Sequence, residues 1–169
     1  MTTHRRRACV ALLGALVPSL LPAATPAGER PMLTFSGRIT RYTDSGRKVY
    51  EISEAALLAM PRRTIRTGTS WTPPARFEGP LLSHLLQLVG GTGSTLRCRA
   101  VDDYEVSVPA SDAERWGVIL AHSMDGKRLS SRDFGPLWLV YPRDEYPREL
   151  DTPATVAKFI WQVDAIEVA

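Results

Sequence analysis

The stretch that decides the fold runs from residue 120 to residue 142 and reads LAHSMDGKRLSSRDFGPLWLVYP. Its first residues belong to an apolar run over residues 117–124, and its last seven residues are almost entirely apolar, which predicts two strands. The dipeptide Asp125-Gly126 predicts a tight turn after the first strand. The second strand, residues 136–142, shows no polar alternation, so we expect it to be covered on both faces. Two polar loops, residues 124–127 and 131–136, therefore lie beside buried strands.

Outward from this stretch, short strands alternate with short helices. The Ser111–Glu114 spacing predicts a capping box, Ser53 and Thr152 are expected to cap helices, and residues 71–79 are expected to form a loop. The pattern predicts a single α+β domain with a mixed or antiparallel sheet. Further strands are expected at 32–40, 48–52, 62–70, 95–101, 104–108 and 162–168, and helices at 54–60, 80–89 and 154–160.

The N-terminus has the layout of an export signal. Three arginines at positions 5–7 precede an apolar run over residues 8–24, and small residues follow up to Ala27. This order is typical of a secretory signal peptide, with cleavage expected after Ala24 or Ala27. The alternative is an N-terminal membrane anchor, which prolines at 18 and 22 disfavour. We expect a signal peptide at 1–27, a mature domain at 28–169 and a periplasmic location.

Loss of the signal would change the charge of the protein. The 169 residues include 21 Lys and Arg against 18 Asp and Glu, a net charge of +3. Residues 1–27 hold three arginines and no acid, so the mature chain would have no net charge. This removes the argument for nucleic-acid binding from a basic composition. The mature chain would also keep Cys98 as its one cysteine, which excludes an internal disulfide.

Familiar catalytic and metal motifs are missing from the sequence. His84, His122 and Cys98 do not form ligand pairs such as HxxxH or CxxC, so no metal site is predicted from spacing. There is no GxSxG, P-loop or GxGxxG motif. We therefore predict no catalytic residues.

Polar loops next to aromatic residues are more informative. Residues 67–71 place hydroxyls beside Trp71, and residues 102–104 place two carboxylates beside Tyr104. A flat heteroaromatic ligand would stack on an indole, and a guanidine-like edge would pair with a carboxylate. Each group also has a structural explanation, since Trp71 could fill a core and the two aspartates could build a turn. The residues alone therefore predict only a binding domain.

Residues 120–142 resemble the sulfite-oxidase-type molybdopterin-binding domain family. The segments FEGPLLSHLL (77–86), AVDDYEVSVP (100–109) and FIWQVDAIEV (159–168) resemble the same family, and the resemblance covers about residues 62–168. It implies the sulfite-oxidase fold, in which a mixed, partly barrel-like β-sheet carries short peripheral helices.

The sequence departs from this family at three positions. Family enzymes hold molybdenum through a cysteine, and alignment on the Val108-Pro109 pair puts Ala100 there, with Cys98 two residues earlier. Asp133 takes the place of a histidine, and Trp138 takes the place of an arginine that would hold the cofactor's phosphate. These departures argue against a phosphorylated, molybdenum-loaded cofactor.

With these three departures, the sequence is similar to a shorter class of exported proteins that bind a metal-free, unphosphorylated pterin. The resemblance implies a non-enzymatic role, in which the pterin-bound protein acts on the periplasmic region of a membrane-bound diguanylate cyclase or phosphodiesterase. The implied pterin site has an aromatic wall, hydroxyls, an acid for the amino-pyrimidine edge and a second tier of loops. Its residues are Thr69, Ser70, Trp71, Asp102, Asp103, Tyr104, Asp125, Arg132 and Asp133.

Two other functions stay open at this point. In a molybdopterin-dependent oxidoreductase, Cys98 would act as a shifted metal ligand. In a protein–protein interaction module, the pocket would be closed and Trp71 would be part of the core.

Overall fold

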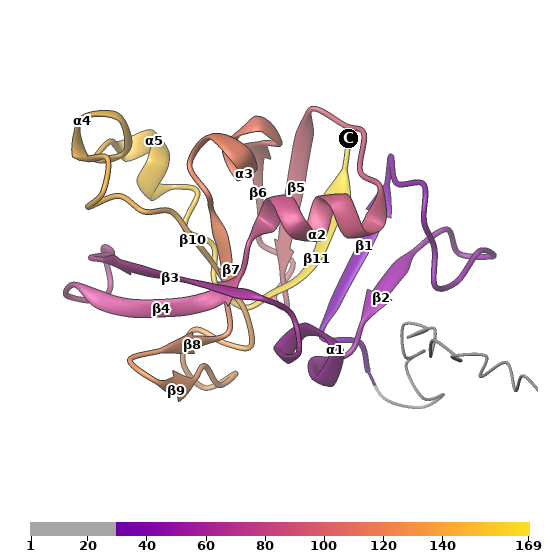
Figure 1. The fold of residues 1–169 in the computed structure, drawn as a ribbon, viewed down its shortest axis with the longest axis horizontal. Coiled ribbons are helices and arrows are strands. Elements are labelled where there is room, and N and C mark those ends of the chain that lie inside the picture. Colours follow the sequence, from indigo (N-terminus) through magenta and orange to yellow (C-terminus); the bar gives the residue numbers. More distant parts are fainter. Residues whose placement is uncertain (1–29) are drawn as a thin grey trace, which may run out of the picture.

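The computed structural model describes residues 30–169, so the predicted signal peptide at residues 1–27 lies outside the described residues. Short strands and helices alternate along this part of the chain (Figure 1). The strands are β1 (Leu33–Gly37), β2 (Tyr50–Ile52), β3 (Arg62–Thr67), β4 (Ala75–Pro80), β5 (Thr95–Ala100), β6 (Glu105–Pro109), β7 (Ile119–Ala121), β8 (Ser123–Met124), β9 (Lys127–Arg128), β10 (Trp138–Val140) and β11 (Val163–Val168). The helices are α1 (Glu54–Leu58), α2 (Leu82–Val89), α3 (Ser111–Arg115), α4 (Pro147–Leu150) and α5 (Pro153–Val156).

The strands form three sheets. The largest has the order β2-β1-β11-β5-β6, in which β1 and β11 are parallel and the other pairs are antiparallel. The second has the order β3-β4-β8-β9, and β10 pairs with β7 in the third. Figure 1 shows the five-stranded sheet on the right and the β3–β4 hairpin reaching to the left. Mixed sheets with short helices confirm the predicted α+β class.

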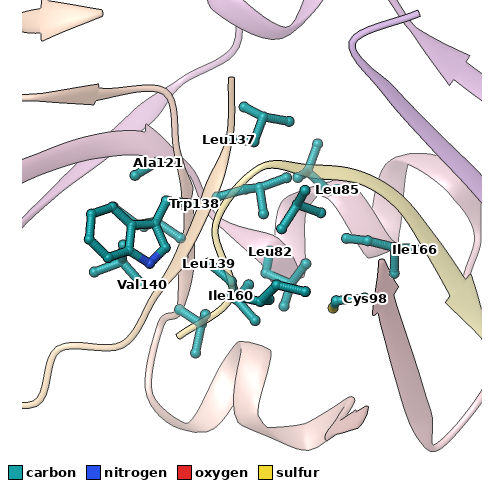
Figure 2. Close-up of a cluster of buried hydrophobic side chains, with 14 of the residues drawn as sticks. Leu82, Leu85, Cys98, Ala121, Leu137, Trp138, Leu139, Val140, Ile160 and Ile166 are labelled. Carbon is teal, nitrogen blue, oxygen red and sulfur yellow. The ribbon is translucent and has the colours of Figure 1, made fainter. Parts of the chain in front are cut away.

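The core lies between these sheets and α2. Leu82, Leu85 and Val89 share one face of α2 and are fully buried. Strand β10 is completely buried, which confirms the prediction of an apolar strand covered on both faces. Figure 2 shows side chains of β10, β11 and α2 meeting in one cluster.

Several local predictions from capping chemistry are confirmed. The Ser53 hydroxyl accepts a hydrogen bond from the Ala56 amide at 3.2 Å, and the Thr152 hydroxyl accepts one from the Thr155 amide at 3.2 Å. Helix α2 ends at Gly90, whose φ of 63° lies in the left-handed region that glycine adopts without strain. The Asp125-Gly126 pair forms the turn between β8 and β9.

Other predictions are wrong in part. Ala75–Pro80 is a strand, not a loop, because Ala75, Phe77 and Gly79 alternate toward the core after the two prolines. Consequently Pro80 ends β4, and α2 starts at Leu82. The capping box is absent in α3, since its N-cap is Ala110 and Ser111 is already helical. The strand predicted over 117–124 divides at His122, because β7 pairs with β10 whereas β8 pairs with β4.

None of the helices within residues 30–169 combines the length and the apolar character needed to cross a membrane.

Candidate functional site

A cavity of about 480 Å³ opens between three segments that are distant in the sequence. The first is the β5–β6 hairpin, the second is the β3–β4 loop, and the third is α5 with the chain that leads to β11. Its volume lies within the range of about 300–1,000 Å³ that is usual for small-molecule sites. The lining residues are Trp71, Ala100, Asp102, Tyr104, Pro153, Val156, Ala157, Phe159, Ile160 and Trp161.

The β5–β6 hairpin supplies the polar groups of the cavity. Ala100 is the last residue of β5 and is 4% exposed, while Asp102 and Tyr104 lie in the connection and are exposed. Asp102 Oδ1 accepts a hydrogen bond from the Tyr104 amide at 3.2 Å, which closes a local turn. In the described part of the chain, Asp102 Oδ2 has no hydrogen-bond partner. One carboxylate oxygen at the cavity is thus available to a ligand.

Two tryptophans form the aromatic wall. The ring centroids of Trp71 and Trp161 are 4.4 Å apart, and the rings meet edge to face at 78°. Behind them, Trp138 is fully buried and lies 6.2 Å from Trp71 and 6.1 Å from Trp161. Trp71 itself is 44% exposed, so one side of its ring is open. Trp71 is therefore a wall of the cavity and not a core residue.

Thr69 holds the loop that carries Trp71. Its hydroxyl accepts hydrogen bonds from the amides of Trp71 at 3.1 Å and Thr72 at 3.0 Å, and it lies 2.9 Å from the Thr72 hydroxyl. These bonds use the hydroxyl within the loop. The structure thus gives Thr69 a role in loop shape, and it is not among the lining residues of the cavity.

The structure brings three of the predicted site residues together in the cavity, namely Trp71, Asp102 and Tyr104. The others lie outside its lining. Ser70 is exposed in the β3–β4 loop, and Asp103 is turned toward Arg99, with 3.8 Å between Asp103 Oδ1 and Arg99 Nη1. Their ligand roles stay predictions.

The loops after β7 serve the fold. Asp125 Oδ1 accepts a hydrogen bond from the Arg76 amide at 2.8 Å, which fastens the β8–β9 turn to β4. Asp133 Oδ2 accepts one from the Ser130 hydroxyl at 2.9 Å within its own loop. Arg132 is exposed on the same loop. The predicted second tier of Asp125, Arg132 and Asp133 does not line this cavity.

Residues 153–161 form one side of the cavity that the sequence patterns did not predict. Trp161, Phe159 and Ile160 line the cavity together with α5. A signal was present, because an apolar aromatic cluster, FIW, stands between a helix-start motif and the last strand. Its position opposite the β5–β6 hairpin depends on pairing between β11 and β5, which the residues alone did not specify.

The segment of residues 153–161 is fastened to α3 by a partly buried ion pair. Lys158 Nζ lies 2.7 Å from Asp112 Oδ2 on α3, and the same oxygen accepts a hydrogen bond from the Tyr141 hydroxyl at 3.0 Å. The ammonium also lies 5.5 Å from the centre of the Tyr141 ring. The chain segment that carries Phe159 and Trp161 is thereby tied to the core.

Cys98 does not reach the cavity. It is fully buried and faces the core beside its cross-strand neighbour Ile166 (Figure 2). Burial raises the pKa of the Cys98 thiol to about 12, so the thiol stays protonated at neutral pH. Within residues 30–169, no group of three or more His, Cys, Asp or Glu side chains is arranged to hold a metal ion.

The comparisons with known proteins agree with this fold. The family model described as the oxidoreductase molybdopterin binding domain matches residues 56–145, more than half of the chain. The chain therefore belongs to the oxidoreductase molybdopterin-binding domain family. A comparison with curated proteins found no match.

A solved structure extends the likeness to nearly the whole chain. The sulfane dehydrogenase SoxCD from Paracoccus pantotrophus is similar with a TM-score of 0.60 and 18% sequence identity. The match covers 94% of this chain and 44% of the SoxCD chain, so this chain spans less than half of that protein. At this identity the likeness shows the fold, which confirms the predicted sulfite-oxidase-type architecture.

Molybdenum-loaded molybdopterin does not fit the residues of this cavity. Ala100, which the resemblance aligns with the metal-binding cysteine, offers no ligand atom, and the Cys98 thiol is protonated in the core. A phosphorylated cofactor needs cationic partners, yet none of the ten lining residues is basic and one is an aspartate. Trp138, which the resemblance aligns with a phosphate-binding arginine, carries no positive charge and is fully buried.

Proposed function

We propose that this chain is a non-enzymatic pterin-binding protein of the periplasm, holding a metal-free, unphosphorylated pterin in the cavity described above. The observation that carries the proposal is the combination of an open indole face, one available carboxylate oxygen and an alanine floor. Trp71, Asp102 and Ala100 supply these three features. Each suits the bare ring system, whereas the lining offers no cation for a phosphate and no thiolate for molybdenum.

The pterin would use these groups in a defined way. Its face would stack on Trp71, which contributes about 0.5–1.5 kcal/mol beyond the burial of apolar area. Its amino-pyrimidine edge offers paired N–H donors, and a carboxylate accepts such a pair. The available Oδ2 of Asp102 would accept one of these hydrogen bonds, and Oδ1, which already accepts from the Tyr104 amide, would accept the other through its second lone pair. Asp102 is the one acid in the lining and takes this role. Tyr104 would cover the mouth of the cavity.

The regulatory part of the proposal is that the pterin-bound protein controls a membrane-bound cyclic-di-GMP cyclase or phosphodiesterase through its periplasmic region. The export signal predicted at residues 1–27 and the resemblance to the short exported class support it. Copurification of such a region with the pterin-loaded protein, and its loss with the pterin-free protein, would be the expected result.

The direct test is to recover the protein from a periplasmic extract and record the mass spectrum of the released small molecules. We expect a pterin without phosphate, and calorimetry should then show the emptied protein binding neopterin. The family membership favours one alternative, a molybdopterin-dependent oxidoreductase. Stoichiometric molybdenum by elemental analysis of the same sample would support that alternative and overturn the proposal.

A further inference from the structure

Gln162 occupies an unusual backbone position directly after the aromatic wall. Its φ of 56° is in the left-handed region, where a residue other than glycine is uncommon. It stands between Trp161, which lines the cavity, and Val163, the first residue of β11. Such a conformation is strained and persists only where surrounding contacts hold it.

The contacts of Gln162 account for this conformation. Its side-chain Nε2 donates to the carbonyl oxygens of Ser131 at 3.0 Å and Asp133 at 3.3 Å. Its backbone amide donates to the Phe134 carbonyl at 3.2 Å, and its own carbonyl accepts from the Val101 amide at 3.0 Å. Gln162 therefore forms hydrogen bonds both to the 131–134 loop and to the β5–β6 hairpin.

The loop that Gln162 holds carries the aromatic support of the wall. The Phe134 ring stacks on Trp138 with 4.3 Å between centroids, and it meets the edge of Trp161 at 5.8 Å. Trp161 in turn contacts Trp71 at 4.4 Å. The orientation of the wall thus depends on where the 131–134 loop stands relative to residue 161.

We propose that Gln162 is a positioning residue, which fixes Trp161 against Trp71 and aligns the wall with the Asp102 hairpin for the ligand. The proposal rests on the proposed function, because it assigns the consequence to pterin binding. The two side-chain N–H donors of Gln162 and its strained backbone together set the geometry of the cavity. No contact of Gln162 with the ligand is required.

Three substitutions in the full chain separate these contributions. Gln162→Met keeps the length of the side chain without its donors, and Gln162→Glu replaces the donors with a carboxylate facing two carbonyl oxygens. Gln162→Gly relieves the backbone strain but also removes the donors. Gln87→Glu, at the chain's other glutamine on the exposed side of α2, is the control for the added charge.

The measurements are neopterin affinity by calorimetry, the near-ultraviolet circular dichroism of the ligand-free tryptophans, and the urea midpoint. We expect Gln162→Met and Gln162→Glu to weaken neopterin binding about fivefold to tenfold and to change the tryptophan spectrum. Gln162→Gly should show the same loss of affinity, although its backbone is relaxed. Gln87→Glu should match the wild type in all three.

Wild-type affinity and an unchanged spectrum in Gln162→Met and Gln162→Glu would overturn the positioning role. A lower urea midpoint with unchanged neopterin affinity and an unchanged tryptophan spectrum would overturn the positioning role as well, since Gln162 would then be merely structural. If the wild-type protein fails to bind neopterin, the proposed function fails. The tryptophan spectra then decide separately whether Gln162 sets the wall.

Discussion

Cys98 and Ala100 lie two residues apart on the same face of β5, yet only Ala100 lines the candidate cavity. A strand rises about 3.3 Å per residue, so the two side chains start about 6–7 Å apart. The core neighbours of Cys98, among them Ile166, occupy the space around the thiol. A metal above Ala100 is therefore out of reach of the only thiol in the described chain.

This relationship predicts the reactivity of two thiols. In a Cys9→Ser background, Cys98 should not react with a disulfide reagent such as DTNB under native conditions, because its raised pKa keeps it protonated and burial blocks access. Adding Ala100→Cys should introduce one thiol that reacts readily from the cavity, measured by absorbance of the released thiolate. Rapid reaction of Cys98 in the native protein would contradict the placement of β5.

The neighbouring aspartates 102 and 103 should differ in ligand binding. Asp102→Asn should weaken neopterin binding about tenfold or more, because a charge-assisted hydrogen bond contributes about 1.5–3 kcal/mol. Asp103→Asn is the matched control, since Asp103 has a 90% exposed side chain and faces Arg99. Calorimetry on both variants checks this. Equal losses, or a larger loss for Asp103→Asn, would show that the wrong acid has been assigned.

Trp71→Ala should separate binding from folding. Trp71 is 44% exposed and its contacts are one-sided, so we expect an unfolding cost smaller than the about 3–5 kcal/mol of a buried aromatic. Neopterin affinity should fall about tenfold with the loss of the stacking face. Urea unfolding and calorimetry measure the two effects. A large loss of stability with unchanged affinity would support the closed interaction module instead.

The elements that sequence patterns predicted well are those fixed by local chemistry. The Ser53 cap, the Gly90 end of α2 and the buried strand at residues 138–140 each follow from propensity or from an apolar run. The strand at residues 75–80 was missed because the prolines at 73 and 74 suggested a longer loop than exists.

Only part of the cavity lining could be predicted from the sequence, because the rest depends on contacts between distant segments. Trp71, Asp102 and Tyr104 were predicted because aromatic and acidic side chains stand together in polar loops and because the family resemblance implies a pterin site there, and all three line the cavity. Trp161 looked like an ordinary apolar residue, and its role appears only when β11 pairs with β5 and carries it to the hairpin. Nonlocal strand pairing of this kind is not encoded in the spacing of either segment.

Loss of the ion pair between Lys158 and Asp112 should destabilise the folded protein. Lys158→Met would leave the Asp112 carboxylate, whose side chain is 10% exposed, without its cation. We expect a loss of about 3 kcal/mol in the free energy of unfolding, and a partial recovery in the double variant with Asp112→Asn. Urea denaturation of the two single variants and the double variant measures the coupling.

The control for Lys158→Met is the exposed ion pair between Arg97 and Glu167. Arg97→Met breaks the contact with Glu167, whose two side chains are 52% and 46% exposed, and it should cost less than about 1 kcal/mol. Similar costs for Lys158→Met and Arg97→Met would show that Lys158 does not hold the wall segment in place.

His122 should make stability depend on pH between neutral and mildly acidic conditions. Burial lowers the pKa of His122 in the folded protein, and the positive charges of Arg128 and Arg62 lower it further. In the unfolded chain the pKa of a histidine is about 6.5, so below that pH the unfolded state gains a proton that the folded state excludes. Stability should therefore be fully retained above this value and fall as the pH decreases.

The expected slope has an upper limit of about 1.4 kcal/mol per pH unit for one proton. It should be visible between about pH 6.5 and pH 5, above the range in which ordinary carboxylates titrate. His122→Gln should flatten this part of the curve, whatever its effect on stability at pH 7.5. Urea unfolding at half-unit intervals measures both slopes, and a slope that survives unchanged in His122→Gln would mean that another group takes up the proton.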